Sequence, residues 1–98
     1  MHVMINQFRL RPESAEDCLS VIEEYVAEVK AREPGVVVFE AYRQPDGVSF
    51  TQVVAFKDGK AELDHRDTDH GRKFRDSVAP LCDIPPGFTP GELVASTR

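Results

Sequence analysis

Residues 33–57 read EPGVVVFEAYRQPDGVSFTQVVAFK. Two runs rich in β-branched and aromatic residues, 36–43 and 48–56, flank the tetrapeptide QPDG. Each run is too short for a typical helix and is bounded by Gly or Pro, which favours strands. Pro45 presets φ at the second turn position, and Gly47 can adopt the left-handed conformation that a hairpin bulge needs. The stretch therefore predicts a β-hairpin.

The segments on either side of the hairpin complete a recognisable order of elements. Residues 2–10 predict a strand, and the recurrence of apolar residues at steps of three and four predicts a helix from Ser14 to Arg32, before Pro34-Gly35. Ser14 and Asp17 resemble a capping box at its start. After the hairpin, residues 61–66 and 70–81 predict a helix in two pieces, with possible N-caps at 67–69.

The end of the chain is rich in Pro and Gly. We expect residues 83–87 to form a loop and residues 88–96 to form a last strand. Because Pro90-Gly91 interrupts it, this strand lies either at a sheet edge or across on a partner subunit. The resulting order, βαββαβ, is that of the ferredoxin-like unit. We therefore predict a single α+β domain over residues 1–98, with an antiparallel sheet and two helices on one face.

Neither face of the predicted strands is cleanly polar. In the hairpin, alternation puts Val37 and Phe39 on one face and Val36 and Val38 on the other. The helices of this fold cover only one face of the sheet, so the second apolar face needs another cover. A second copy of the chain is the simplest cover, which predicts a homodimer formed through the open sheet face.

Composition excludes several classes of partner. The 98 residues carry a formal net charge of -5, with no basic stripe, which argues against nucleic acid and anionic membranes as partners. We expect no signal peptide and no membrane span. The two cysteines, Cys18 and Cys82, indicate reduced thiols. We expect a cytoplasmic protein.

Two polar residues in apolar surroundings are candidates for chemistry. Asn6 lies mid-strand, where its amide either satisfies the backbone or donates to a ligand oxygen. His70 begins the apolar stripe that Phe74 and Val78 continue, so it can act as a general base, or it can bond Asp67 or solvent. On one continuous helix the side chains of His65 and His70 would point ~140° apart around the helix axis. The histidines of a helical zinc site are four residues apart and share one side of the helix, so we expect no metal site.

Aromatic side chains can line a cleft or simply fill the core. The set consists of Phe8, Tyr25, Phe39, Phe50, Phe56 and Phe74. No phosphate-binding loop and no nucleophile with an evident base partner appears in the sequence.

The chain resembles the antibiotic biosynthesis monooxygenase (ABM) family. The resemblance is carried by Glu33-Pro34-Gly35, by the hairpin, and by His65 and His70, which are spaced as in that family's His-Leu-x-Ser-x-His-Phe helix break. Gly71 stands where the family has an aromatic residue, and Phe74 partly fills that space. The resemblance implies a dimeric α+β barrel in which two sheets pack face to face.

The resemblance also implies a reaction. Characterised members oxidise polycyclic phenols or quinols with O₂, without metal or flavin. It implies that His70 assists deprotonation and that Asn6 holds the oxyanion. The substrate would lie against Phe8, Tyr25, Phe39, Phe50, His65 and Phe74. A haem-degrading branch also has an asparagine on the first strand, but this chain has no Trp and no His after His70. Two hypotheses therefore stand: a cofactor-independent monooxygenase acting on a small aromatic substrate, and a non-catalytic dimeric barrel that binds a small hydrophobic ligand or a partner.

Overall fold

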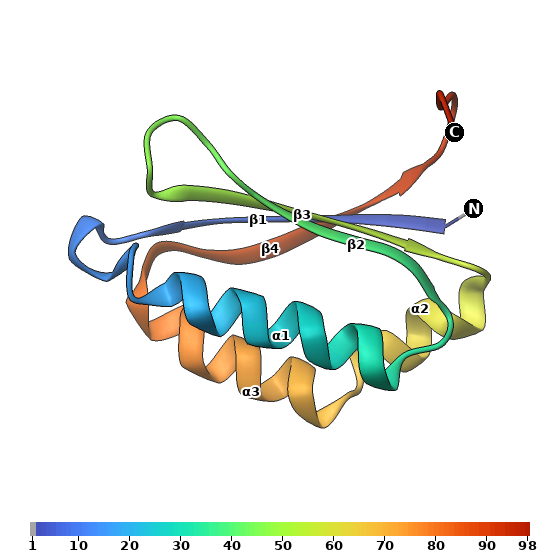
Figure 1. Ribbon diagram of the computed structural model, residues 1–98, viewed down its shortest axis with the longest axis horizontal. Coiled ribbons are helices and arrows are strands. Elements are labelled where there is room, and N and C mark those ends of the chain that lie inside the picture. Colours follow the sequence, from blue (N-terminus) through green and yellow to red (C-terminus); the bar gives the residue numbers. More distant parts are fainter. Residues whose placement is uncertain (1) are drawn as a thin grey trace.

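The computed structural model describes residues 2–98. Its strands are β1 (His2–Leu10), β2 (Val36–Arg43), β3 (Ser49–Phe56) and β4 (Cys82–Glu92). Its α-helices are α1 (Cys18–Arg32), α2 (Gly59–Arg66) and α3 (Asp69–Val78), and Pro12–Ser14 and Ala79–Leu81 form short 3-10 helices. The strands pair antiparallel in the order β2-β3-β1-β4. Figure 1 shows this sheet as one layer above the helices. This arrangement confirms the predicted ferredoxin-like α+β fold.

The β2–β3 hairpin turns at residues 44–47, as its sequence predicts. Gly47 has a φ of 79°, a left-handed conformation that glycine adopts without steric cost. The Asp46 carboxylate accepts hydrogen bonds from the backbone N–H groups of Val48 and Ser49 and from the Ser49 hydroxyl, at 2.6–3.0 Å. These hydrogen bonds hold the pKa of Asp46 below its ordinary value, and the bond from the Ser49 hydroxyl has the largest effect.

An irregularity at the start of β2 overturns one detail of the predicted alternation. The register with β3 shifts between Val36 and Val38, which is the signature of a β-bulge. Val36 and Phe39 therefore both pack against the core, while Val37 is 52% exposed. The prediction that Val37 shares a face with Phe39 is wrong, because one inserted residue reverses the alternation.

The first helix begins later than predicted. Ser14 ends the 3-10 helix Pro12–Ser14, and α1 starts at Cys18. The predicted capping box does not form within residues 2–98, since the Asp17 side chain caps no backbone N–H there. Pro12 at the first position of the short helix instead sets the entry of the chain.

The second helix is broken where the sequence predicts a break. Asp58 caps α2 by accepting from the Ala61 N–H at 2.8 Å, and Thr68 caps α3 by accepting from the Gly71 N–H at 3.1 Å. α3 ends at Val78 rather than Leu81, and the last three residues continue as a 3-10 helix that contains Pro80.

The last strand is longer at its start and shorter at its end than predicted. β4 already begins at Cys82, so the prediction of a loop over 83–87 is wrong, and it ends at Glu92 rather than Ser96. β4 pairs with β1 alone and is an edge strand, as predicted. An edge tolerates Pro85, Pro86 and Pro90, and the register with β1 shifts close to the first two.

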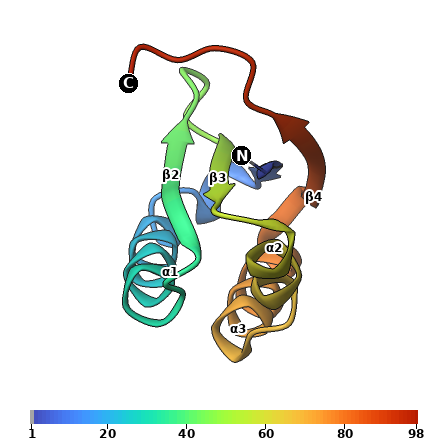
Figure 2. The same cartoon turned by 90° about the vertical axis from the view of Figure 1, so that its right-hand side faces the viewer.

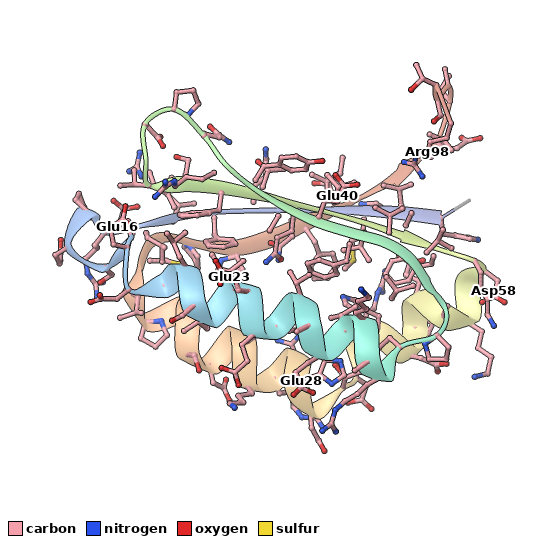
Figure 3. All side chains as sticks on the ribbon, in the orientation of Figure 1. Glu16, Glu23, Glu28, Glu40, Asp58 and Arg98 are labelled. Atoms are coloured by element: carbon pink, nitrogen blue, oxygen red, sulfur yellow. The ribbon has the colours of Figure 1, made fainter. Side chains whose placement is uncertain are left out.

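All three α-helices lie on one face of the sheet (Figure 2). Between these two layers lies the core, whose most deeply buried side chains include Leu10, Val29, Phe56 and Val78. The opposite sheet face carries no helix in the described part of the chain; there Val3, Ala55 and Val38 are cross-strand neighbours. Figure 3 shows Glu40 on the same side. No helix among residues 2–98 has the length and apolarity that crossing a membrane requires.

Candidate functional site

Glu33 connects two histidines just beyond the end of α1. Its Oε1 lies 2.7 Å from His65 Nδ1, and its Oε2 lies 2.6 Å from His70 Nε2. The side chains are only 9%, 6% and 13% exposed for Glu33, His65 and His70. Because a carboxylate only accepts hydrogen bonds, each of these ring nitrogens is assigned a hydrogen. We call Glu33, His65 and His70 the carboxylate cluster.

The local sequence brings Glu33 against α2. The Glu33 N–H still bonds the Val29 carbonyl at 3.0 Å, so its side chain leaves from the last turn of α1. The chain then passes close to α2, since a Cβ on Gly35 would lie 2.5 Å from the Ala61 Cβ. A glycine is required at this approach. Glu33 is thereby fixed beside the helix that carries His65.

The break between α2 and α3 directs both histidines to the same carboxylate. His65 lies in the last turn of α2, and His70 in the first turn of α3, after the cap at Thr68. The angle of ~140° that a continuous helix would impose on this spacing therefore does not apply. His70 bonds Glu33, rather than Asp67 or solvent.

A second polar pair lies on the sheet. Asn6 of β1 and Gln52 of β3 are direct cross-strand neighbours, and Asn6 Nδ2 donates to Gln52 Oε1 at 3.1 Å. Asn6 Oδ1 and Gln52 Nε2 are buried and have no partner among residues 2–98. If the oxygen and nitrogen of both side-chain amides are exchanged, the pair still has one acceptor and one donor without a partner. We call Asn6 and Gln52 the amide pair.

A cavity of about 240 Å³ brings the two polar groups together between sheet and helices. His65 and the amide pair line it, with aromatic and aliphatic walls. The lining residues are Met4, Asn6, Tyr25, Phe39, Gln52, Val54, His65, Arg66, Phe74, Arg75, Pro86 and Phe88. An apolar cavity with a few converging polar groups is the usual form of a small-molecule site.

Tyr25 and Phe74 form an aromatic wall of this cavity. Their rings stack with centroids 4.3 Å apart, and Phe39 meets Tyr25 edge-on at 5.4 Å. Burial, and then the charge of Glu33, raises the pKa of Tyr25 to about 12, so its hydroxyl stays protonated at neutral pH. A second hollow of about 220 Å³, between α1 and α3, also touches Tyr25 and Phe74, and His70 lines it.

The structure distributes the sequence-predicted residues unevenly. Asn6, Tyr25, Phe39, His65 and Phe74 line the cavity together. His70 does not line it and reaches it only through Glu33 and His65. Phe8 and Phe50 stack on each other within the core, with ring centroids 5.4 Å apart, and do not line it either.

Sequence reasoning missed Glu33 and Gln52 as site residues. Glu33 directly precedes Pro34-Gly35 in the stretch that predicts the hairpin, but no local sequence pattern indicates that it binds two histidines. Gln52 had a signal, since it lies on the helix-facing side of a strand that is otherwise apolar there. Among residues 2–98 no group of three His, Cys, Asp or Glu side chains is arranged to hold a metal ion.

The sequence of this chain matches the profile of one known protein family. Residues 1–77 match the sequence profile of the antibiotic biosynthesis monooxygenase family. No curated protein sequence matches the chain at a significant level.

Solved structures share the fold at low sequence identity. Rv0793 from Mycobacterium tuberculosis superposes with a TM-score of 0.87 at 18% identity, covering 99% of this chain and 98% of its own. An antibiotic biosynthesis monooxygenase gives 0.86 at 18% identity, with 97% and 100% covered. A variant of SnoaB, a cofactor-independent oxygenase from Streptomyces nogalater, gives 0.83 at 16% identity, with 98% and 95% covered.

Proposed function

This chain belongs to the antibiotic biosynthesis monooxygenase family, and we propose that it is a cofactor-independent monooxygenase that oxidises a small phenol or quinol with O₂. The observation that carries the proposal is one cavity lined both by a histidine that a carboxylate orients and by an amide pair with a free donor and a free acceptor. The volume of about 240 Å³ lies below the usual range for drug-sized ligands, which suits one or two rings.

His65 has the role of general base in this proposal. Its Nδ1 hydrogen is engaged by Glu33 at 2.7 Å, which leaves Nε2 as the acceptor. In the proposed reaction Nε2 takes the proton of the substrate hydroxyl. The sequence assigned this role to His70, which bonds the other oxygen of Glu33 and here holds the carboxylate in place. His70 is therefore a positioning residue in our proposal.

The amide pair receives the substrate oxygen. Its free N–H group can donate to an aryloxide, and its free carbonyl oxygen can accept from a second hydroxyl. Gln52 is 1% exposed, so its amide is held rigidly and needs little reorganisation when charge develops. Burial also raises the cost of leaving these atoms unpaired, which favours a polar ligand group beside them.

The proposed oxidation balances without an added reductant. The aryloxide transfers an electron to O₂, and carbon and oxygen radicals combine to form a C–O bond. The O–O bond then breaks as water leaves. For a phenol, one O₂ adds one oxygen atom to the ring, and the other oxygen departs as water with two substrate hydrogens, leaving a quinone. Tyr25, Phe39 and Phe74 exclude competing water from the anion.

We also propose a cytoplasmic homodimer that forms through the open sheet face. The support is a sheet face that no described helix covers, on which the partly exposed Val3 and Val38 flank the buried Ala55. Hydrophobic surface of this kind is commonly buried by a partner. Sedimentation equilibrium that returns the mass of one chain at micromolar concentration would contradict the dimer.

Oxygen uptake by the purified, metal-stripped protein tests the activity. With a panel of quinols and anthrones, we expect His65→Ala and Asn6→Ala each to lower the enzymatic rate at least tenfold, about 1.4 kcal/mol of barrier. His2→Ala is the matched control, because the His2 side chain is 55% exposed and does not line the cavity. His70→Ala should lower kcat with KM nearly unchanged, and His70→Gln should recover part of kcat by donating to Glu33.

The outcomes separate the two functions that the sequence left open. Uptake that survives metal removal and falls in His65→Ala supports the oxygenase. A protein that binds these aromatics, as calorimetry detects, but never exceeds the uncatalysed rate would be a binding barrel instead.

A further inference from the structure

Two arginines stand where the cavity opens to solvent. Arg66 of α2 and Arg75 of α3 both line it, and both are exposed, as is Phe88 of β4 beside them. The Arg66 guanidinium lies over the Phe88 ring, 5.6 Å from its centroid. The mouth is therefore formed by two cationic heads and an aromatic ring, whereas the rest of the lining is largely apolar.

Arg75 is the cation at this mouth without an acidic partner. Arg66 shares its charge with Glu62 at 3.0 Å. Among residues 2–98 no carboxylate lies within 4.0 Å of the Arg75 guanidinium and no hydrogen bond engages it. Its Nη1 and the Tyr25 hydroxyl each lie 3.7 Å from the point where a Cβ on Gly71 would stand, so the head reaches back toward the aromatic wall.

The neighbours of Arg75 on the same helix show that this is a local exception. Arg72 forms ion pairs with Asp67 and Asp69, and Lys73 lies 3.4 Å from Glu24. The chain as a whole carries a net charge of -5, so acidic partners are plentiful. An unpaired guanidinium beside a low-dielectric cavity attracts anions more strongly than one in open water.

We propose that the substrate of this site is an aromatic hydroxy acid, whose ring fills the cavity, whose hydroxyl meets the amide pair, and whose carboxylate binds Arg75 with Arg66 beside it. The inference rests on the proposed function for the hydroxyl end and extends it by the acid group. The amide pair lines the cavity from the sheet and the arginines line it from the helices, so the two ends of one ligand meet different chemistry. Guanidinium groups suit carboxylates because they offer two parallel N–H donors.

Calorimetric titration of the full chain with a matched pair of probes tests the acid group. The probes are 2-naphthol and 6-hydroxy-2-naphthoate, which differ only in the carboxylate. We expect the carboxylate to bind about tenfold tighter, the effect of a charge-assisted contact that is partly exposed. Arg75→Gln should remove most of that preference and leave 2-naphthol binding within about twofold. Added salt should reduce the difference in affinity between the two probes in the wild-type protein, because it screens the charge of the arginine.

Arg72→Gln is the control, because Arg72 lies on the same helix, carries the same charge and does not line the cavity. The wild-type preference should persist in this variant. The inference is overturned if the carboxylate gives no gain, if Arg75→Gln retains the gain, if Arg72→Gln loses it equally, or if neither probe binds. Binding with the expected preference but without oxygen uptake would remove the proposed oxidation alone, since the titration does not depend on turnover.

Discussion

The carboxylate cluster and the amide pair are two buried polar groups that contact the same cavity, yet they differ in how completely their hydrogen bonds are made. In the cluster both oxygens of Glu33 have partners, at 2.7 and 2.6 Å. In the amide pair a single bond of 3.1 Å joins the side chains, and one atom of each amide stays unpaired in the described structure.

The difference separates a supporting role from a receiving one. A carboxylate with both oxygens bonded holds the two histidines in one geometry and leaves only the Nε2 of His65 for the substrate. A half-satisfied pair costs stability in the empty protein and regains it when a polar ligand arrives. Proteins often accept such a cost at functional sites. The comparison therefore predicts opposite responses of stability when each group is removed.

The largest expected effect comes from Glu33→Ala. This change removes two hydrogen bonds to a charged group and leaves two buried imidazoles without their acceptor. We expect the free energy of unfolding to fall by about 2–4 kcal/mol. Urea denaturation followed by circular dichroism measures it.

Glu28→Ala is the matched control for that measurement. Glu28 lies near the end of the same helix and pairs with Arg32, but both side chains are more than a third exposed. An exposed pair four residues apart contributes little, so the loss should stay below about 0.5 kcal/mol. A Glu33→Ala loss as small as that of the control would show that the cluster does not support the fold.

Tyr25 lines the same cavity as the amide pair, and its ring lies 6.5 and 6.1 Å from those of His65 and His70. It gives an intermediate, pH-dependent effect. Its pKa is raised from 10 to about 12 in the folded state, first by burial and then by Glu33. Below pH 10 the tyrosine is protonated in both states and its full contribution is present. Between pH 10 and 12 the unfolded chain ionises first, so stability falls by about 2–3 kcal/mol.

Tyr25→Phe isolates this dependence from the other groups that titrate in alkali. The difference between wild-type and variant unfolding free energies, measured by urea denaturation at each pH, should be constant up to pH 10 and should then shift in favour of the variant. A parallel course of the two curves up to pH 12 would show that the Tyr25 hydroxyl ionises equally easily in the folded and unfolded chain.

The smallest expected effect on stability comes from the amide pair. The double change Asn6→Leu with Gln52→Met replaces both amides by apolar side chains of similar size. We expect the free energy of unfolding to stay within about 1 kcal/mol of the wild type or to rise, because no polar atom is left unpaired. Oxygen uptake and binding of 2-naphthol should fall together.

Gln52→Met alone sharpens this comparison. It leaves Asn6 with no side-chain partner at all, so this single variant should be less stable than the double variant. Thermal unfolding of the three proteins measures the order. A double variant that unfolds at the lowest temperature would place the amide pair among the supporting groups instead.

Local patterns were sufficient for most of the fold. The turn residues Pro45 and Gly47 and the β-branched runs beside them predict the hairpin, and helical periodicity predicts α1 and the break before α3. The errors arise where local preference yields to pairing. The segment 83–87 has the composition of a loop, but β1 offers it a ladder at an edge where prolines are tolerated.

Local sequence patterns point to only part of the candidate site. Alternation along β1 puts Asn6 on the helix-facing side, and the spacing of His65 and His70 marks the helix break. Glu33, in contrast, becomes a site residue through contacts 32 and 37 positions away, and Gln52 through a contact 46 positions away. No local pattern encodes such contacts. His70 was expected in the cavity because a stripe identifies the buried side of a helix but not which of two adjacent hollows it meets.

The prolines of β4 also bear on how this sheet resists aggregation. An edge strand with free N–H and C=O groups can capture a strand from another chain and start a fibril. Pro85, Pro86 and Pro90 supply no N–H at one edge. At the other, β2 carries a bulge beside Val37 and charged side chains at Glu40 and Arg43. Both edges are thus poor templates for an incoming strand, and the sheet can associate through its face without also growing sideways.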